Sequence, residues 1–350
     1  MFPVSIFPIG GIILTIKDIA RLCGVSVSTV SRVLNNHPDV SAENRQRVLA
    51  VIKQTNFIPN NSARSLVKTT SDSIGVLVRG LSNPFYTDII RAMEEQIRNR
   101  GYTMVMQQIS SEEDELTFGA MMERDKRLQG IIFLGGRSDY TEEEVSVLNI
   151  PFVCCTYTNC YGTLSRDAYS SVSIEDEQTA FDAVSELVRA GHRKIAALIC
   201  QPDDKSISQL RYQGYRKALQ ENGLESHNDL LICADSFDIK DAYLAVKQKL
   251  GEGTSFSALF CISDMMALGA MRALQESGYR IPDDCSVLAI DGLDTTDYIT
   301  PRLTTLCQPM AELGQRSVDI LLDLIGGTGT NRQETLAAIL RNGESVKSLL

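Results

Sequence analysis

Short apolar strands alternate with amphipathic helices along most of this chain, and this pattern constrains the fold more than any other feature. The strand segments are SIGVLV, YTMVMQQI, GIIFLG, PFVCC, SSVSI, KIAALIC, LLICA, SALFCI and CSVLAI. Helices between them end on glycines that lead into the next strand, at Gly101, Gly191, Gly223 and Gly278. Alternating strands and helices form parallel sheets covered on both faces. Because residues 69–350 exceed one small sheet, we expect an α/β core of two doubly wound parallel sheets, with a ligand cleft between them.

Three short helices are predicted ahead of this core. Thr15 caps a helix over Ile16–Cys23, and Gly24 ends it, since glycine readily takes positive φ. Ser26 caps a second helix over Val27–Leu34. Ser41 caps a third helix, whose buried stripe is expected to be Val48, Leu49, Val51 and Ile52. A helix, a glycine-containing turn and two further helices are typical of a helix-turn-helix domain.

The second of these helices has an unusual composition, with serine, threonine and valine in place of good helix formers. Val30, Val33 and Leu34 are spaced to pack inward. The outward positions carry short or polar side chains: Val27, Ser28, Thr29, Ser31, Arg32 and Asn35. Short side chains allow a helix to lie deep in a major groove, where hydroxyls reach phosphates and an arginine grips guanine. A serine-rich surface helix without function remains the alternative for this pattern taken alone.

The charge distribution also favours a nucleic-acid partner for the N-terminal part. The whole chain carries a net charge of −10. Residues 14–68 hold eight Lys or Arg against three Asp or Glu, which makes this segment +5 and the remainder −15. A basic head on an acidic body indicates that the head alone meets a polyanion.

The segments before and after this basic head can also be interpreted from the sequence. Residues 1–13 are apolar and uncharged and lack the basic start of a signal peptide. We expect them to be a non-native or disordered extension, upstream sequence read from a wrong start, with Leu14 as the natural initiator. After Pro59, a short helix over Asn61–Val67 and a Thr/Ser linker are predicted. This helix is too short to be stable until something packs on it.

No motif of a hydrolase, metalloprotease, nucleotide-binding loop or dinucleotide-binding loop occurs, and the three histidines lack metal-ligand spacing. We therefore expect no enzyme activity, no cofactor and no metal. No apolar run approaches twenty residues, so no membrane partner is expected. Nine cysteines without a C-x-x-C pair indicate reduced thiols in a cytoplasm. The acidic run Glu112–Glu115 is interpreted as the solvated first turn of a helix.

The residues from TIKDIARLCGVSVSTVSRVLNNHPDVSAENRQRVLAVIKQTNFIPNNSARSL onward resemble the lac repressor family of bacterial regulators. The likeness extends from about residue 15 to the end, through SNPFYTDII, VSIEDEQTAFDAVSELVRAGHRKIA, SDMMALGAMRAL and TPRLTTLCQP. The resemblance implies base-reading roles for Val27, Ser28 and Arg32, and phosphate contacts for Ser26, Thr29, Ser31 and Asn35. It also implies that Ala63, Arg64 and Leu66 belong to a hinge helix whose leucine enters the minor groove.

The resemblance further implies an effector site in the cleft, formed by Phe85, Tyr86, Lys205, Arg211, Phe237, Asp264 and Asp291. Arg211 and Asp291 match positions that face each other across the cleft in the family, and a structural ion pair between the lobes is the alternative. Three places depart from the family pattern: Arg79, Ser263 before Asp264, and Ala289-Ile290 before Asp291-Gly292. These departures leave open which ligand is bound.

The sequence thus predicts a helix-turn-helix DNA-binding domain (residues 14–58), a hinge helix and linker (59–72), and a periplasmic-binding-protein-like core. The first lobe would comprise residues 73–173 and 308–337, and the second lobe residues 174–307 and 338–350. The expected function is a repressor that binds a pseudo-palindromic operator as a homodimer and responds to a sugar, sugar phosphate or nucleoside-like effector. Two alternatives are a regulator of the same fold whose co-effector is a phosphorylated carrier protein, and a ligand-binding protein without DNA function.

Overall fold

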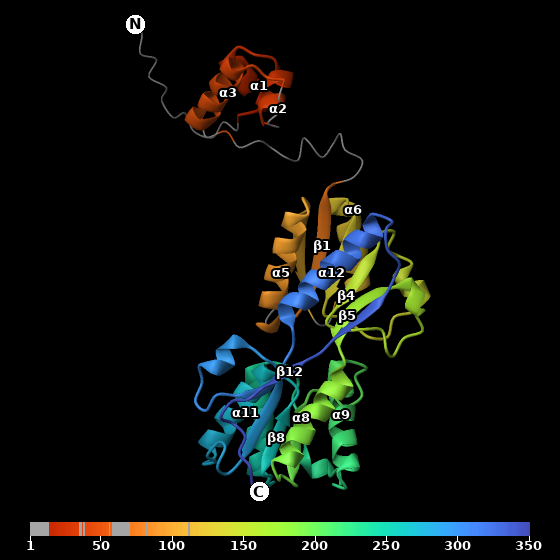
Figure 1. Ribbon diagram of the computed structural model, residues 1–350, viewed down its shortest axis with the longest axis vertical. Coiled ribbons are helices and arrows are strands. Elements are labelled where there is room, and N and C mark those ends of the chain that lie inside the picture. Colours follow the sequence, from red (N-terminus) through yellow and green to blue (C-terminus); the bar gives the residue numbers. More distant parts are fainter. Residues whose placement is uncertain are drawn as a thin grey trace. The chain divides into compact units, whose positions relative to one another are not determined.

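The computed structural model describes residues 14–34, 37, 39–55, 57, 71–80, 83–110 and 113–350. The chain divides into two compact units, residues 1–70 and residues 71–350, which we call the head and the core (Figure 1). The predicted N-terminal extension and the predicted hinge helix lie outside the described residues.

The head contains three helices, α1 (Ile16–Cys23), α2 (Val27–Leu34) and α3 (Ala42–Thr55). Thr15 and Asp18 form a reciprocal capping box at the start of α1, and Gly24 ends this helix with a φ of 64°. The three helices share a small apolar core that includes Ile19, Val30, Val33 and Val48. The helix-turn-helix prediction is therefore confirmed.

One predicted core position in the head is wrong. Leu49 is 49% exposed, whereas its neighbour Val48 is fully buried. The hydrophobic stripe of α3 is thus narrower than its sequence suggested, because only one face of α3 meets α1 and α2.

The core consists of two six-stranded sheets, each of which defines a lobe. In the N-lobe the strand order is β11-β5-β4-β3-β1-β2. Its strands are β1 (Ser73–Arg79), β2 (Thr103–Ile109), β3 (Gly130–Leu134), β4 (Phe152–Cys155), β5 (Ser170–Ile174) and β11 (Gln333–Leu336), and its helices are α5 (Phe85–Asn99), α6 (Glu115–Lys126), α7 (Glu142–Val145) and α12 (Met310–Ile325). All pairings in this sheet are parallel.

In the C-lobe the strand order is β12-β10-β9-β8-β6-β7. Its strands are β6 (Ile195–Ile199), β7 (Leu231–Cys233), β8 (Ala258–Cys261), β9 (Ser286–Asp291), β10 (Thr304–Cys307) and β12 (Ile339–Arg341), and its helices are α8 (Asp176–Arg189), α9 (Ile207–Glu221), α10 (Ile239–Gly251) and α11 (Asp264–Glu276). Only β12 runs antiparallel to its neighbour. The two doubly wound sheets are confirmed, although β10, β11 and β12 were not predicted.

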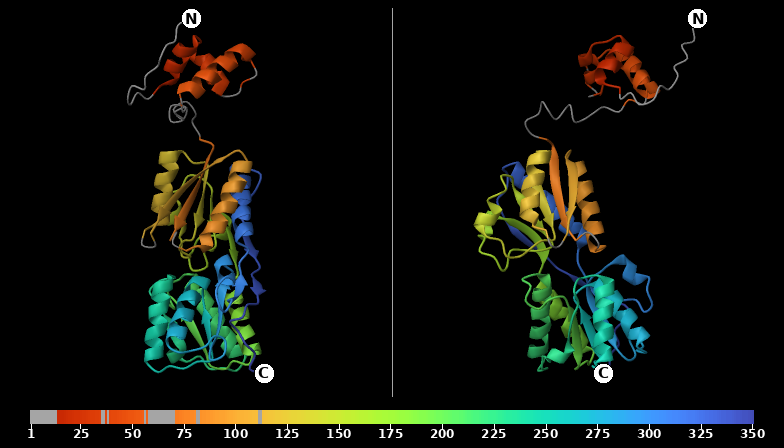
Figure 2. Two further views of the ribbon diagram at one scale, coloured as in Figure 1. Left: turned by 90° about the vertical axis from the view of Figure 1, so that its left-hand side faces the viewer. Right: turned by 180° about the vertical axis from the view of Figure 1, so that it is seen from behind.

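Helices cover both faces of each sheet (Figure 2). In the N-lobe, alternate strand residues such as Val76 and Ile132 pack beneath α5 and α12. The residues between them, such as Leu77 and Phe133, pack with α6 on the opposite face. This alternation explains why each strand reads as a continuous apolar run.

The chain crosses between the lobes in a way that fixes which ends of the sheets face each other. A single residue separates the end of β5 in the N-lobe from the start of α8 in the C-lobe. Two residues separate the end of β10 in the C-lobe from the start of α12 in the N-lobe. Each sheet therefore presents the carboxyl ends of its parallel strands to the other lobe, which is the edge where such folds bind ligands.

Candidate DNA-binding surface and effector site

The second helix of the head presents a polar, partly exposed surface at the positions singled out from the sequence. Val27 is 41% exposed, Ser28 and Arg32 are exposed, and Thr29 and Ser31 are half-buried. The Ser26 hydroxyl accepts the backbone N–H of Thr29 at 3.1 Å and lies within hydrogen-bond distance of the Ser28 and Thr29 hydroxyls. Hydroxyls gathered at a helix N-terminus suit phosphate oxygens, because the helix dipole is positive there. Asn35, Ala63, Arg64 and Leu66 lie outside the described residues.

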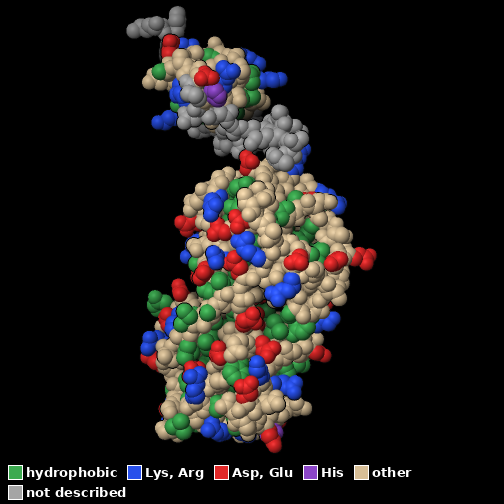
Figure 3. Space-filling view, turned by 45° about the vertical axis from the view of Figure 1, so that its right-hand side comes forward, with side chains coloured by type: hydrophobic (Ala, Val, Ile, Leu, Met, Phe, Trp, Pro, Cys, Tyr) green, Lys and Arg blue, Asp and Glu red, His purple; other side chains and the backbone are tan. Residues whose placement is uncertain are grey.

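The two units differ in surface charge. Among the charged side chains on the visible face of the head, Figure 3 shows more Lys and Arg than Asp and Glu, whereas both signs are interspersed over the core. The head segment is the one that is +5 in sequence. Only the head therefore has the charge that a DNA backbone requires.

In the core, a buried cluster of charges forms around Arg211 of α9, which is 2% exposed. Its Nε donates to Asp176 Oδ1 at 2.8 Å, and its Nη1 donates to the carbonyl of Ile262. The same Nη1 lies 3.6 Å from Asp291 Oδ1. Ile262 and Asp291 lie at the carboxyl ends of the C-lobe strands β8 and β9. Arg211 lies on α9 of the same lobe, and Asp176 begins α8, directly after the chain has crossed from β5 of the N-lobe. The prediction that Arg211 and Asp291 face each other across the cleft is wrong, because α9 packs on the sheet that contains β9.

Asp291 has an unfilled acceptor. Its Oδ1 accepts the side-chain amide of Gln308 at 2.8 Å, but its buried Oδ2 has no hydrogen-bond partner among the described residues. Burial raises the pKa of Asp291 to about 6, although Arg211 and the Gln308 amide oppose this shift. Its φ of 140° is unusual for a residue with a side chain. Buried acceptors and backbone strain of this kind are typical of binding sites.

Asp264 holds the backbone that follows β9. Its Oδ2 accepts the N–H groups of Gly292 at 2.9 Å and Leu293 at 2.7 Å, and its Oδ1 accepts the Thr305 hydroxyl at 2.6 Å. Burial, and after it the charge of Asp291, raises the pKa of Asp264. Both oxygens of Asp264 are thus occupied, so its contribution to a site is to position the loop after Asp291.

The aromatic and lysine candidates lie in different surroundings. Tyr86 is close enough to Asp291, Arg211 and Arg79 to interact electrostatically, and burial, followed by the Asp291 charge, raises the pKa of its hydroxyl to about 12. Phe85 is 5% exposed and packs in the apolar interior of the N-lobe, with its ring 5.6 Å from that of Tyr86. Phe237 packs, half-buried, against the apolar interior of the C-lobe. The structure therefore brings Tyr86, Arg211 and Asp291 together, whereas Phe85 serves mainly as packing.

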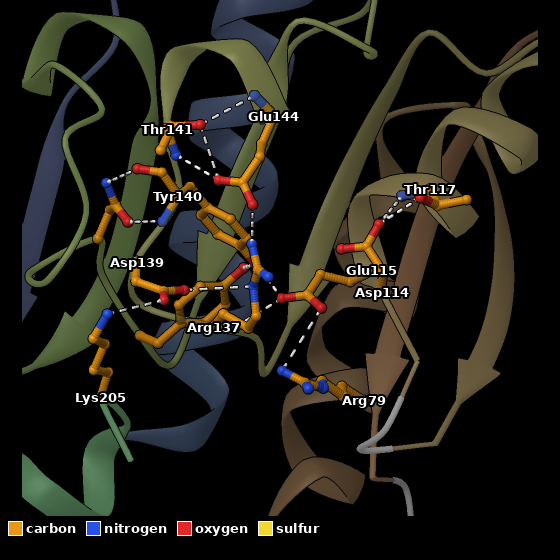
Figure 4. A network of polar contacts seen from close by, with 12 residues as sticks. Arg79, Asp114, Glu115, Thr117, Arg137, Asp139, Tyr140, Thr141, Glu144 and Lys205 are labelled. Atoms are coloured by element: carbon orange, nitrogen blue, oxygen red, sulfur yellow. Dashed lines mark hydrogen bonds and ion pairs between the residues drawn. The ribbon is translucent and has the colours of Figure 1, made fainter. Parts of the chain in front are cut away.

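Lys205 connects the two lobes at the edge of this region. Its Nζ, on the C-lobe segment before α9, lies 3.7 Å from Asp139 Oδ2 on the N-lobe segment after β3. Asp139 also lies 3.5 Å from Arg137 Nε. Figure 4 shows this contact beside a larger polar network.

The network in Figure 4 is centred on Glu115. The interpretation of the acidic run as a solvated first turn agrees with the exposure of Glu113 and Asp114 but is wrong for Glu115. Glu115 begins α6 but is only 1% exposed. Its Oε1 accepts the backbone N–H of Arg137 at 2.7 Å and the hydroxyl of Tyr140. Its Oε2 lies 3.6 Å from Arg79 Nη1. Glu115 is buried because α6 begins directly beneath the loop that follows β3.

Several residues of this region were missed by sequence reasoning, namely Asp176, Gln308, Glu115, Arg137 and Asp139. Asp176 and Gln308 could have been recognised as candidates from the sequence, because each closely follows a strand at a crossing between the lobes. The described residues contain no group of three or more His, Cys, Asp or Glu that could hold a metal ion. None of the helices in the described part of the chain combines the length and apolar character that crossing a membrane requires.

A helix-turn-helix head joined to a two-lobed core with polar groups between its sheets defines a class of ligand-responsive DNA-binding proteins. Comparison with known proteins supports this class. The family "Bacterial regulatory proteins, lacI family" matches residues 15–60, and the "Periplasmic binding protein-like domain" matches residues 184–346.

Relatives along the full length include the HTH-type transcriptional regulator MalR of Clostridium butyricum, which is 38% identical over 326 residues, 92% of this chain and 96% of MalR. The ribose operon repressor of Haemophilus influenzae is 32% identical over 338 residues, 96% of this chain and 99% of the relative. Among solved structures, the lac repressor dimer bound to operator and the anti-inducer ONPF has a TM-score of 0.77 at 28% identity, covering 95% of this chain and 99% of that one. A transcriptional regulator CelR–cellobiose complex has a TM-score of 0.71 at 27% identity, with the same coverage.

The chain therefore belongs to the lacI family of bacterial regulatory proteins. It is a DNA-binding transcriptional repressor with a ligand-binding domain, and not an enzyme.

Proposed function

We propose that this repressor binds a pseudo-palindromic operator as a homodimer in the cytoplasm and is switched by a small effector between the lobes of its core. The observation that carries the proposal is the buried Arg211–Asp291 pair with its unfilled carboxylate oxygen, at the edge where this fold binds ligands. Large apolar side chains that remain exposed on the core, including Met106, Met121 and Tyr298, offer surface for a second copy.

In the head, Val27, Ser28 and Arg32 read bases, and Ser26, Thr29, Ser31 and Asn35 contact phosphates. Arg32 is exposed on α2 and suits bidentate donation to guanine. We expect Arg32→Ala to weaken operator binding by about 1–3 kcal/mol and to relax specificity at one base pair of each half-site. Fluorescence anisotropy on an operator selected from random DNA, together with its single-base variants, measures both effects. A uniform loss across all base variants would instead assign Arg32 to the phosphate backbone.

Residues 59–72 join the head to the core and contain the proposed hinge positions Ala63, Arg64 and Leu66. A leucine inserted between base steps stabilises a kink in the operator. We expect Leu66→Ala to lower operator affinity strongly while the core keeps its affinity for effector. Equal losses in the operator titration and in the ligand titration would show that Leu66 is only a packing residue.

In the core, we propose that Tyr86, Lys205, Arg211, Phe237 and Asp291 contact the effector, with Asp264 and Phe85 as their supports. A carboxylate that accepts hydroxyls, a guanidinium that donates and nearby aromatic rings suit a sugar, sugar phosphate or nucleoside-like ligand. Relatives named for a ribose operon and a solved complex with cellobiose favour a sugar.

The test is operator binding by the full chain at several salt concentrations, with and without sugars, sugar phosphates and nucleosides. Each neutralised phosphate contributes about −0.9 to the log–log salt slope, so a dimer should give a slope of several units. At least one small ligand should change operator affinity. A slope near zero would exclude the DNA interface, and a response only to a phosphorylated carrier protein would favour a surface partner over the cleft.

A further inference from the structure

Glu115 lies at the edge of the N-lobe that faces the C-lobe. It begins α6, Arg79 ends β1, and Arg137 follows β3, so all three occupy the carboxyl ends of parallel strands. Lys205 of the C-lobe reaches Asp139 beside them, as Figure 4 shows. Glu115 is thus placed on the N-lobe side of the proposed effector site, where the sequence had indicated only the aromatic residues Phe85 and Tyr86.

Glu115 resembles Asp291 in having one occupied and one unfilled oxygen. Glu115 Oε1 accepts from Arg137 and Tyr140, whereas the buried Oε2 has no hydrogen-bond partner among the described residues. Its contact with Arg79 at 3.6 Å is an ion pair beyond hydrogen-bond distance. An ionised carboxylate can only accept hydrogen bonds, so Glu115 in the N-lobe and Asp291 in the C-lobe each present a buried oxygen that needs a donor.

The cations of this region are already paired with carboxylates. Arg79 pairs with Glu115, and Lys205 pairs with Asp139. Arg137 pairs with Asp139 and Glu144, and Arg211 pairs with Asp176 and Asp291. Five carboxylates therefore accompany four cations. A phosphate group would meet a net negative site whose cations are engaged, and a cationic ligand would lie beside the guanidinium groups of Arg79 and Arg211.

We infer that Glu115 is a specificity-determining residue of the effector site: its free oxygen accepts a ligand hydroxyl and selects an uncharged polyhydroxy effector, a neutral sugar, over a phosphorylated one. This inference rests on the proposed function, since it presumes that the effector binds between the lobes. Glu115 and Asp291 then accept hydroxyls from the two sides of one ligand. The buried Tyr140 hydroxyl and the Arg137 N–H fix the Glu115 carboxylate in place.

The experiment is isothermal titration calorimetry of the full chain with matched pairs of compounds. The pairs are D-glucose with glucose 6-phosphate, D-ribose with ribose 5-phosphate, and trehalose with trehalose 6-phosphate, and maltose and cellobiose are added as further neutral sugars. At least one neutral sugar should bind, and each that binds should exceed its phosphate ester by at least about tenfold. Glu115→Gln should lower the affinity for the neutral sugar by about tenfold to a hundredfold, which is the usual contribution of a hydrogen bond to a charged group. The ratio of the affinity for the sugar to that for its phosphate ester should also fall.

Glu144→Gln is the matched control. Glu144 belongs to the same network, but its two oxygens are occupied by Arg137 and Thr141, and it is partly exposed. Its amide variant should change sugar affinity by less than about twofold. Thermal unfolding of both variants separates a loss of folding from a loss of selectivity, because a purely structural Glu115 would lower the melting temperature and leave the ratio of sugar to ester unchanged.

Three results would overturn the inference. The first is a phosphate ester that binds more tightly than its neutral partner, and the second is the absence of binding by every neutral sugar of the panel. The third is an equal change in sugar affinity in Glu115→Gln and Glu144→Gln. The first result, combined with release of operator by the ester, would leave the proposed function intact. Operator binding that ignores every compound of the panel would instead count against the proposed function itself.

Discussion

The effector site that we propose is built around buried carboxylates. An ionised carboxylate is costly to bury, and Arg211, the Gln308 amide and the backbone of Asp264 favour the ionised form of Asp291. A ligand hydroxyl that donates to the unfilled Oδ2 of Asp291 would add a further stabilising contact. Binding and ionisation of Asp291 are therefore coupled.

This coupling predicts a pH-dependent affinity for the effector. Burial raises the pKa of Asp291 to about 6, so the group is largely protonated at pH 5 and ionised at pH 7.5. Because the ligand prefers the ionised form, binding at low pH must release a proton, and affinity should rise by about tenfold from pH 5 to pH 7.5 and then level off. Calorimetric titrations across this range with the neutral sugar that binds measure the effect. Asp291→Asn should bind weakly and lose most of this pH dependence, and an affinity that falls as the pH rises would contradict the assignment.

Sequence reasoning found some of these residues and missed others for a physical reason. Arg211 and Asp291 were identified because they follow recognisable family segments. Glu115 could not be identified, since three acidic neighbours in sequence suggest solvent exposure, and its burial results from contacts with Arg137 and Tyr140, more than twenty residues away. The opposite error was made at Leu49, which was expected to be buried because it is apolar. It is exposed, because an apolar side chain does not always have a packing partner.

Helices and strands with strong local sequence signals could be predicted from those signals alone. The capping box at Thr15 and the positive φ of Gly24 define α1 at both ends, as its sequence indicated. By contrast, β11 and β12 are short, partly exposed edge strands. Their apolar residues follow no clear alternation, so nothing local distinguished them from a loop. Their pairing depends on the crossing between the lobes, which is a tertiary property.

Helices α8 and α9 lie in close contact, so a larger side chain between them should destabilise the core. A Cβ added to Gly214 of α9 would clash with the backbone carbonyl of Glu177 in the first turn of α8. Gly214→Ala should therefore push the helices apart and lower the free energy of unfolding by about 1–3 kcal/mol or more. Since Arg211 and Asp176 lie on these two helices, effector affinity should fall as well. Urea unfolding followed by circular dichroism measures the first effect.

Gly251 provides the control for this substitution. It is the last residue of α10, and a Cβ added there meets no atom within 4 Å. Gly251→Ala should leave stability unchanged or raise it by up to about 1 kcal/mol, because alanine favours the helix. If both alanine variants were equally stable, the close approach of α8 and α9 would not be a constraint on the fold.

For the whole molecule, the proposed switch requires only that the effector favour one arrangement of the lobes. A difference of about 1–3 kcal/mol between two arrangements changes operator affinity by about 5-fold to 150-fold. Two of the three crossings between the lobes, those after β5 and after β10, connect residues of the proposed effector site directly to helices α8 and α12. A change at the site therefore has a short covalent route into both lobes.

The switch can be tested with variants that separate operator binding from the response to effector. Arg211→Ala should abolish the response, but it also leaves Asp176 and Asp291 buried without their cation, which should cost about 3–5 kcal/mol of stability. Asp291→Asn keeps the shape and the neighbours of Asp291 while removing its charge. We expect this variant to bind operator like the unaltered chain and to lose most of the effector-induced change, as measured by anisotropy titrations with and without effector. In the proposed arrangement the head holds the operator and the core holds the effector. A normal response in Asp291→Asn would therefore mean that the signal enters elsewhere, and a partner bound to the surface of the core would then become the better explanation of the switch.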